Sequence, residues 1–142
     1  MNADQATVLS SLEVVAERCD DIVPSVYARL FEARPDLREF FAVHAGDAPR
    51  SGMGNMVNEI LRMLAGDDGD LDLDCEAQAT VVFHTGWGLG MDMYRDVLEA
   101  VVATVQQVCG EQWSSFAEAW HTRVDAVTEA LRTHYEAIEG TR

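Results

Sequence analysis

Apolar residues recur every three or four positions along most of this chain, and no segment alternates apolar and polar residues as a strand does. The pattern is clearest where Val97, Val101, Val105 and Val108 fall on one face of an expected helix. An amphipathic helix has to bury its apolar face against neighbouring elements. We therefore expect an all-α fold of six or seven helices, with residues 1–142 forming a single domain.

Prolines and glycines mark where these helices should begin and end. Pro24 suits the first turn of a second helix, and Pro35 should end that helix. Gly110 should separate a long helix, from about residue 92 to residue 108, from a last helix that begins near residue 114. These breaks leave only short connections between the expected helices.

Charge and cysteine content exclude several classes of protein. The chain has 25 Asp and Glu residues against 10 basic residues, all of them Arg, and a formal charge of −15. Such a charge opposes binding to nucleic acid or to an anionic membrane surface. No apolar run approaches the ~20 residues that span a bilayer, and residues 1–5 do not resemble a secretory signal. Three widely spaced cysteines are typical of reduced thiols, so we expect a cytoplasmic protein.

An acidic connection follows the middle of the chain and resembles a calcium loop at its start. Asp70, Asp72 and Asp74 alternate as calcium ligands do, but Cys75 stands at the glycine position and Val81 at the closing glutamate. A solvated loop is therefore the preferred interpretation.

His84 is the residue with the clearest chemical meaning. It ends the apolar stretch 79–83, directly before a glycine-containing break, and Tyr94 follows ten residues later. A neutral imidazole at the end of a helix is suited to hold a metal-centred cofactor from one side. The competing interpretation is an ordinary core or surface histidine.

Four local patterns resemble the globin family, particularly the bacterial single-domain and flavohaemoglobin-type globins. Residues 26–31 are similar to the second-helix motif of that family, which contains a tyrosine, here Tyr27. Pro35 and Phe41 fit the short third helix and its conserved phenylalanine, residues 84–94 fit the proximal histidine with its tyrosine, and residues 109–120 fit the opening of the final helix. The patterns occur in order over most of the chain.

The resemblance implies a globin fold whose helices sandwich a non-covalent haem b, with His84 as the ligand of the iron. It further implies that Phe41 stacks on the haem, that Tyr94 supports the histidine and that the Tyr27 hydroxyl points at the bound gas. The alternative for Tyr27 is a buried ring with its hydroxyl at the surface. The expected cofactor contacts are Tyr27, Phe41, Met53, Met56, His84, Leu89, Tyr94 and Val97.

The side of the haem expected to face His84, called the proximal side, differs from the family at one position. Flavohaemoglobin-type globins have a glutamate in the last helix that supports the histidine, but here that position falls at or near Tyr135. Glu136 is one residue away, which rotates it by about 100° around a helix. This difference weakens the expectation of an anionic, peroxidase-like proximal side.

The helix expected to cover the gas-binding side of the haem, called the distal helix, can be aligned with the globin pattern in two ways. Counting back from His84 places Gly52 and Met56 over the ligand, whereas a longer loop places Pro49 and Met53 there. Neither register contains the family's glutamine or histidine, so we expect an apolar, methionine-lined wall.

Three further histidines are expected to be peripheral. His44 could meet a haem propionate or act as a sixth ligand, but a solvent-exposed loop position is preferred. His121 and His134 are expected on the exposed face of the last helix.

The function expected from this resemblance is reversible binding of dioxygen, nitric oxide or carbon monoxide. The alternatives are a haem-based gas sensor, a nitric oxide dioxygenase with an external reductase, and a globin-fold module without haem. No catalytic residue is assigned, and enzymatic turnover is not expected without an external electron donor. The expected partners are a diatomic gas and, for turnover, a reductase; a homodimer stays open, and neither nucleic acid nor membrane is expected.

Overall fold

The computed structural model describes residues 3–44, 49–66, 73–84 and 89–140, and these residues are almost entirely helical. They form seven α-helices and one 3-10 turn, which confirms the all-α expectation within the described ranges. The elements are α1 (Ala3–Arg18), α2 (Val23–Ala33), α3 (Pro35–His44), α4 (Pro49–Ala65), α5 (Leu73–His84), α6 (Met91–Cys109), η1 (Gly110–Gln112) and α7 (Trp113–Glu139).

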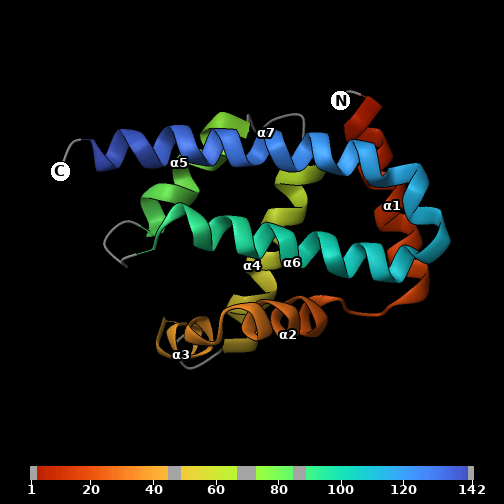
Figure 1. Ribbon diagram of the computed structural model, residues 1–142, viewed down its shortest axis with the longest axis horizontal. Helices are drawn as coiled ribbons and strands as arrows, with labels where there is room; N and C mark the ends of the chain where they lie inside the picture. Colours follow the sequence, from red (N-terminus) through yellow and green to blue (C-terminus); the bar gives the residue numbers. More distant parts are fainter. Residues whose placement is uncertain (1–2, 45–48, 67–72, 85–88, 141–142) are drawn as a thin grey trace.

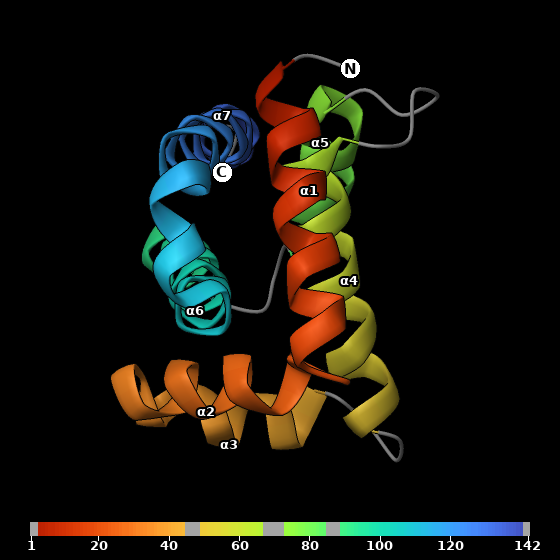
Figure 2. The ribbon, with the colours of Figure 1, turned by 90° about the vertical axis from the view of Figure 1, so that its right-hand side faces the viewer.

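The helices cross one another in two layers. The long helices α6 and α7 run side by side in opposite directions (Figure 1), while α1, α4 and α5 form the other layer (Figure 2). Helices α2 and α3 close one edge of both layers (Figure 2). The main packing partners are α1 with α7, α5 with α7, and α2 with α6. The core therefore lies between helix pairs that cross at large angles.

Local sequence explains where α2 and α6 begin and end. Pro24 lies in the first turn of α2, where a missing backbone N–H costs nothing, and α2 ends at Ala33 before Pro35. Val97, Val101 and Val105 are buried along one side of α6. Burial of each such side chain contributes about 1.5–3 kcal/mol to folding, so this stripe fixes which face of α6 points inward.

Gly110 allows the chain to turn from α6 into α7. Its φ of 59° and ψ of −127° lie in a region that L side chains rarely adopt. Arg18 of α1 donates hydrogen bonds from Nη1 to the carbonyl of Cys109 at 2.8 Å and to that of Val108 at 3.2 Å. These bonds satisfy carbonyls at the end of α6 that lack helical partners.

We expect Gly110→Ala to destabilise the protein by about 1–3 kcal/mol, the usual cost of a strained backbone conformation. A Cβ at Gly110 would meet Arg18 Nη1 at 4.0 Å, an ordinary contact, so the cost is conformational rather than steric. Urea unfolding measures the loss. Gly140→Ala is the control, because the φ of Gly140 is −67° and suits any residue. Equal losses in both variants would contradict the assignment of strain to Gly110.

Buried Arg123 joins α7 to the end of α4. Its Nε donates to the carbonyl of Leu64 at 2.7 Å and its Nη2 donates to that of Met63 at 2.9 Å. Burial lowers the pKa of Arg123, but a guanidinium titrates so far above neutrality that it stays charged. The side chain thus caps α4 from another helix and holds α4 against α7.

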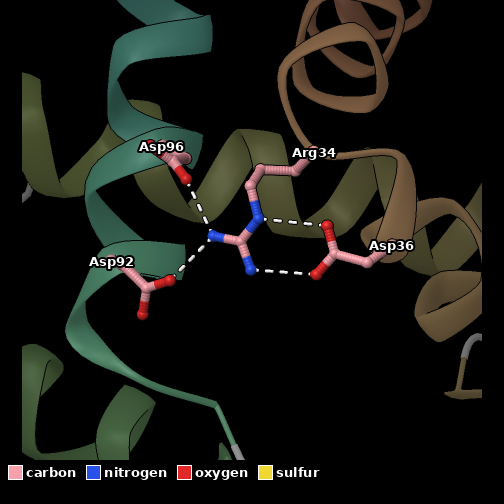
Figure 3. Close-up of polar contacts among 4 residues, drawn as sticks. All are labelled: Arg34, Asp36, Asp92 and Asp96. Atoms are coloured by element: carbon pink, nitrogen blue, oxygen red, sulfur yellow. Dashed lines mark hydrogen bonds and ion pairs between the residues drawn. The ribbon is translucent and has the colours of Figure 1, made fainter.

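Arg34 joins the corner between α2 and α3 to the start of α6 (Figure 3). Its guanidinium donates to both carboxylate oxygens of Asp36, at 3.1 and 2.9 Å, and its Nη1 donates to Asp92 at 2.9 Å and to Asp96 at 2.8 Å. The hydrogen bonds from Arg34 also lower the pKa of Asp36. This cluster fixes α3 relative to the first turns of α6, where Tyr94 lies.

The expected position of His134 was wrong. Its side chain is only 17% exposed, and its Nε2 lies 2.8 Å from an Asp74 carboxylate oxygen at the start of α5. The reason is that α5 packs on α7 and covers this part of it. His121, by contrast, is exposed as expected.

Three further sequence expectations concern the cysteines, a membrane-spanning helix and the calcium loop. Cys19, Cys75 and Cys109 are all free thiols, as expected. Within the described ranges, no helix is both long and apolar enough to cross a membrane. Asp70 and Asp72, on which the calcium alternative depended, lie outside the described residues.

Candidate functional site

His84 is the last residue of α5, and its ring is held by the helix itself. Its Nδ1 lies 2.7 Å from the backbone carbonyl of Thr80, one turn earlier. Because a carbonyl can only accept, Nδ1 must carry the proton of this bond, and the neutral imidazole then has its lone pair on Nε2. Burial is the main cause that lowers the pKa of His84 below 6.5. At neutral pH the residue is therefore a neutral imidazole with a basic Nε2.

Tyr94 lies beside His84, and Tyr135 lies close enough to Tyr94 to affect it. The ring of buried Tyr94, from α6, lies 5.9 Å from the His84 ring at an angle of 86°. Burial, with a smaller contribution from Tyr135 of α7, raises the pKa of Tyr94 to about 12, so Tyr94 is a neutral phenol. Glu136 is exposed. The contacts of His84 described here are therefore the Thr80 carbonyl and the neutral phenol of Tyr94, and Tyr135 lies near that phenol.

Four aromatic residues of α2 and α3 form a second group, which we call the aromatic cluster: Tyr27, Phe31, Phe40 and Phe41. Phe41 is at its centre, with ring centroids 5.3 Å from Tyr27, 5.8 Å from Phe31 and 5.7 Å from Phe40. Edge-to-face pairs of this kind contribute about 0.5–1.5 kcal/mol each beyond simple burial. The cluster therefore holds the Tyr27 ring in one orientation.

The hydroxyl of Tyr27 is inside the protein. Tyr27 is only 3% exposed, and its hydroxyl donates to the sulfur of Met56 in α4 at 3.7 Å. Burial raises the pKa of Tyr27 above its ordinary value of 10, so the hydroxyl stays protonated. The alternative of a hydroxyl at the surface was wrong, because α4 covers this part of α2.

Of the remaining residues predicted to contact the cofactor, the structure describes the side chains of some but not of others. Val97 is buried in α6 and Leu89 is half-buried just before it. Met56 contacts Tyr27 through its sulfur. The side chains of Met53 and His44 lie outside the described residues, although both positions are helical.

Helix α3, which carries Phe40 and Phe41, lies toward the same end of the molecule as the end of α5, where His84 lies. Figure 1 shows the end of α5, the start of α6 and helix α3 together toward the left of the view. No group of three or more His, Cys, Asp or Glu residues that could hold a metal ion occurs among the described residues. The arrangement therefore offers one nitrogen donor, a set of aromatic rings and one buried hydroxyl.

Sequence reasoning missed the role of Thr80, and it placed Tyr135 near the histidine only through the family resemblance. The signal for Thr80 was available, because the residue four positions before a helical histidine presents its carbonyl to it. The Thr80 hydroxyl itself donates to the carbonyl of Glu76 at 2.9 Å. Tyr135 could not be placed beside Tyr94 without the packing of α7 on α6.

A separate groove between α2 and α6 contains none of the predicted site residues. It is lined by Arg29, Glu32, Ala33, Asp96, Glu99, Ala100 and Ala103. Its walls are charged and its apolar part consists of alanines, so it lacks the aromatic surface of the site described above.

Comparison with known proteins does not assign the chain to a family. No protein-family model, no curated protein and no solved structure matches it. The function has therefore to be inferred from the chemistry of His84, Tyr94, Tyr27 and their neighbours.

Proposed function

We propose that this chain is a globin-type haem protein that reversibly binds a diatomic gas at an iron held by His84. The observation that carries the proposal is the hydrogen bond from His84 Nδ1 to the Thr80 carbonyl. A metal-binding histidine almost always donates its other ring N–H in this way, because the bond fixes the tautomer and strengthens the donor nitrogen. Burial also keeps the imidazole neutral, as a metal ligand must be.

The donor set fits haem better than it fits a bare ion. A protein-only metal site needs three or four side-chain ligands, and the described residues hold no such group. A porphyrin brings four nitrogen ligands of its own, so one histidine on one face is enough. The globin fold packs its helices in crossed pairs around the haem, and the crossed packing of α1, α2, α4, α6 and α7 supports that architecture here.

Haem iron would supply a coordination position for dioxygen, nitric oxide or carbon monoxide, and would make bound dioxygen partly anionic while leaving carbon monoxide almost uncharged. His84 would hold the cofactor, and Thr80 and Tyr94 would fix the ring of His84. Phe41 would pack on the haem face, because the aromatic cluster holds its ring in place. Leu89 and Val97 would supply apolar contacts.

Tyr27 would favour dioxygen over carbon monoxide. Its buried hydroxyl is protonated and can donate a hydrogen bond to a ligand that carries negative charge. The same bond would do little for an uncharged ligand. Oxidation of nitric oxide would need a reductase to supply electrons, so we propose binding rather than turnover as the activity of these residues.

Optical spectra of the purified protein test the proposal. We expect a Soret band from the protein as isolated or after addition of hemin, and a shift of that band when the reduced protein meets carbon monoxide. Protein that is colourless and does not bind hemin would contradict the proposal and leave a haem-free helical module.

Replacing Tyr27 by phenylalanine should speed dioxygen dissociation from the haem-loaded protein by about 5- to 150-fold. This range corresponds to the loss of a hydrogen bond worth roughly 1–3 kcal/mol to a charged acceptor. Stopped-flow measurement after rapid removal of dioxygen gives the rate. Carbon monoxide dissociation from the same variant is the internal control and should hardly change; an unchanged dioxygen rate would remove Tyr27 from the site.

A further inference from the structure

Arg34 extends its side chain from a fixed point of the backbone. It is the single residue between α2 and α3. Its N–H donates to the carbonyl of Leu30 at 2.7 Å, and its carbonyl accepts from the N–H of Leu37 at 3.0 Å. Its side chain is only 25% exposed. The guanidinium therefore starts from a corner that two helices hold in place.

The planar guanidinium of Arg34 joins two helices at once (Figure 3). Nε and Nη2 donate to the two carboxylate oxygens of Asp36 in the first turn of α3, and Nη1 donates to Asp92 and Asp96 of α6. Asp92 and Asp96 are four residues apart, so they lie one turn apart on the same side of α6. A rigid fork fixes direction as well as charge, whereas a lysine ammonium is a point charge on a flexible stem. The cluster therefore fixes the first two turns of α6 relative to α3.

The start of α6 has a particular need for this cation. Asp92 and Asp96 are like charges at a spacing that destabilises a helix, and Asp36 adds a third negative charge. Gly90, at the N-cap of α6, has no side chain that could cap the helix. Removal of the guanidinium would leave the three carboxylates to repel one another. We therefore expect the start of α6 to move away from α3 when Arg34 is lost.

The same turns of α6 carry a residue of the candidate site. Tyr94 lies between Asp92 and Asp96 in the chain, and its ring lies 5.9 Å from that of His84 at the end of α5. A displacement of the start of α6 would carry the Tyr94 ring with it. Helix α3, on the other side of the fork, carries Phe41. The fork thus relates the proposed haem-packing phenylalanine to the tyrosine beside the histidine.

We propose that Arg34 is a positioning residue of the haem site, whose fork holds Tyr94 against the proximal histidine, His84. This inference rests on the proposed function. Arg34 acts through Tyr94 and not through contact with the cofactor. Loss of the fork would take from the His84 ring one of the contacts that fix its orientation, and the orientation of a ligating histidine affects its bond to the metal.

Arg34→Gln tests this role, since glutamine is polar but lacks both the charge and the fork. Arg132→Gln is the matched control, because Arg132 forms an ion pair with Glu129 at 2.6 Å within α7. Arg34→Lys is a second variant that keeps a cation among the three carboxylates and so protects the fold. It should restore only part of what Arg34→Gln loses, because an ammonium cannot replace the fork.

The protein without haem gives the first readout, through nuclear Overhauser effects between ring protons. The signal between Tyr94 and His84 should lose most of its intensity in Arg34→Gln and stay unchanged in Arg132→Gln. The signal between Trp113 and Trp120, whose rings are 6.2 Å apart in α7, should persist in every variant. An unchanged signal between Tyr94 and His84 in Arg34→Gln would overturn the proposal, as would an equal loss of both signals.

The haem-loaded, reduced protein gives the second readout, through the iron–histidine stretching band of its resonance Raman spectrum. Arg34→Gln should move the band to lower frequency and broaden it, and Arg132→Gln should leave it unchanged. Tyr94→Leu should have a similar effect, and Arg34→Gln added to Tyr94→Leu should cause no further shift, because both act through one contact. Additive shifts, or an unchanged band in Arg34→Gln, would overturn the proposal.

Two other outcomes are distinct. Full recovery of both signals in Arg34→Lys would show that charge alone is sufficient, and would overturn the role of the fork. Failure of the unaltered protein to bind hemin would overturn the proposed function as well, whereas hemin binding with an unchanged ring contact and band in Arg34→Gln would overturn only the role of Arg34.

Discussion

Replacing His84 by alanine should abolish stable haem binding, the largest functional effect we expect. The change removes the only side-chain nitrogen proposed to hold the cofactor while leaving α5 intact, because alanine is the best helix former. After addition of hemin and gel filtration, the unaltered protein should keep its Soret band and His84→Ala should lose most of it. Added imidazole should restore part of the band by occupying the space of the lost side chain.

His121→Ala is the matched control for that experiment. His121 lies on the exposed side of α7, so its loss should leave the Soret band unchanged. A full Soret band in His84→Ala would show that another residue binds the iron. Haem binding should also weaken as the pH falls through the pKa of His84, which burial places below 6.5, because a proton then occupies Nε2.

Replacing Trp120 by alanine should destabilise the protein by about 3–5 kcal/mol, the usual cost of removing a large aromatic side chain from a core. Trp120 of α7 is fully buried, and its Nε1 donates to the hydroxyl of Ser11 in α1 at 2.8 Å. Ser11 Oγ in turn donates to the carbonyl of Val8 at 2.6 Å. The substitution therefore leaves a cavity and takes one partner from the buried Ser11 hydroxyl.

Trp113→Ala is the control for this experiment, because it removes an indole side chain that is not fully buried. Trp113 opens α7 and is half-buried, and its ring centroid lies 6.2 Å from that of Trp120 with the rings tilted by 41°. Its removal should cost clearly less, since the surrounding space is open to water and no cavity forms. Urea unfolding followed by circular dichroism compares the two variants. Equal losses would show that Trp120 is not the anchor between α1 and α7.

The helices themselves could be predicted closely from the sequence. A helix expected from about residue 92 to residue 108 extends over Met91–Cys109, and one expected from about residue 114 begins at Trp113. Gly110 breaks the chain where expected. These features are local, since backbone geometry and the spacing of apolar residues act over one or two turns.

For the candidate site, the sequence predicted which types of residue take part but not how their side chains contact one another. The pattern around His84 pointed to a ligand, and the packing adds that the Thr80 carbonyl fixes its tautomer. Residue spacing could not choose between the two distal registers. The contact from Tyr27 to Met56 places one of the two methionines beside the hydroxyl, because the α2–α4 crossing depends on side chains far apart in the chain.

The amino-acid sequence alone therefore determined the all-α class, the ends of most helices and the kinds of side chain at the site. Only the tertiary structure decided that Arg123 caps α4, that Asp74 contacts His134 and that the Met56 sulfur accepts a hydrogen bond from Tyr27. The physical reason is the distance along the sequence over which each interaction acts. Helical periodicity is set by neighbours within four residues, whereas each of these contacts joins helices that meet only after the whole chain has packed.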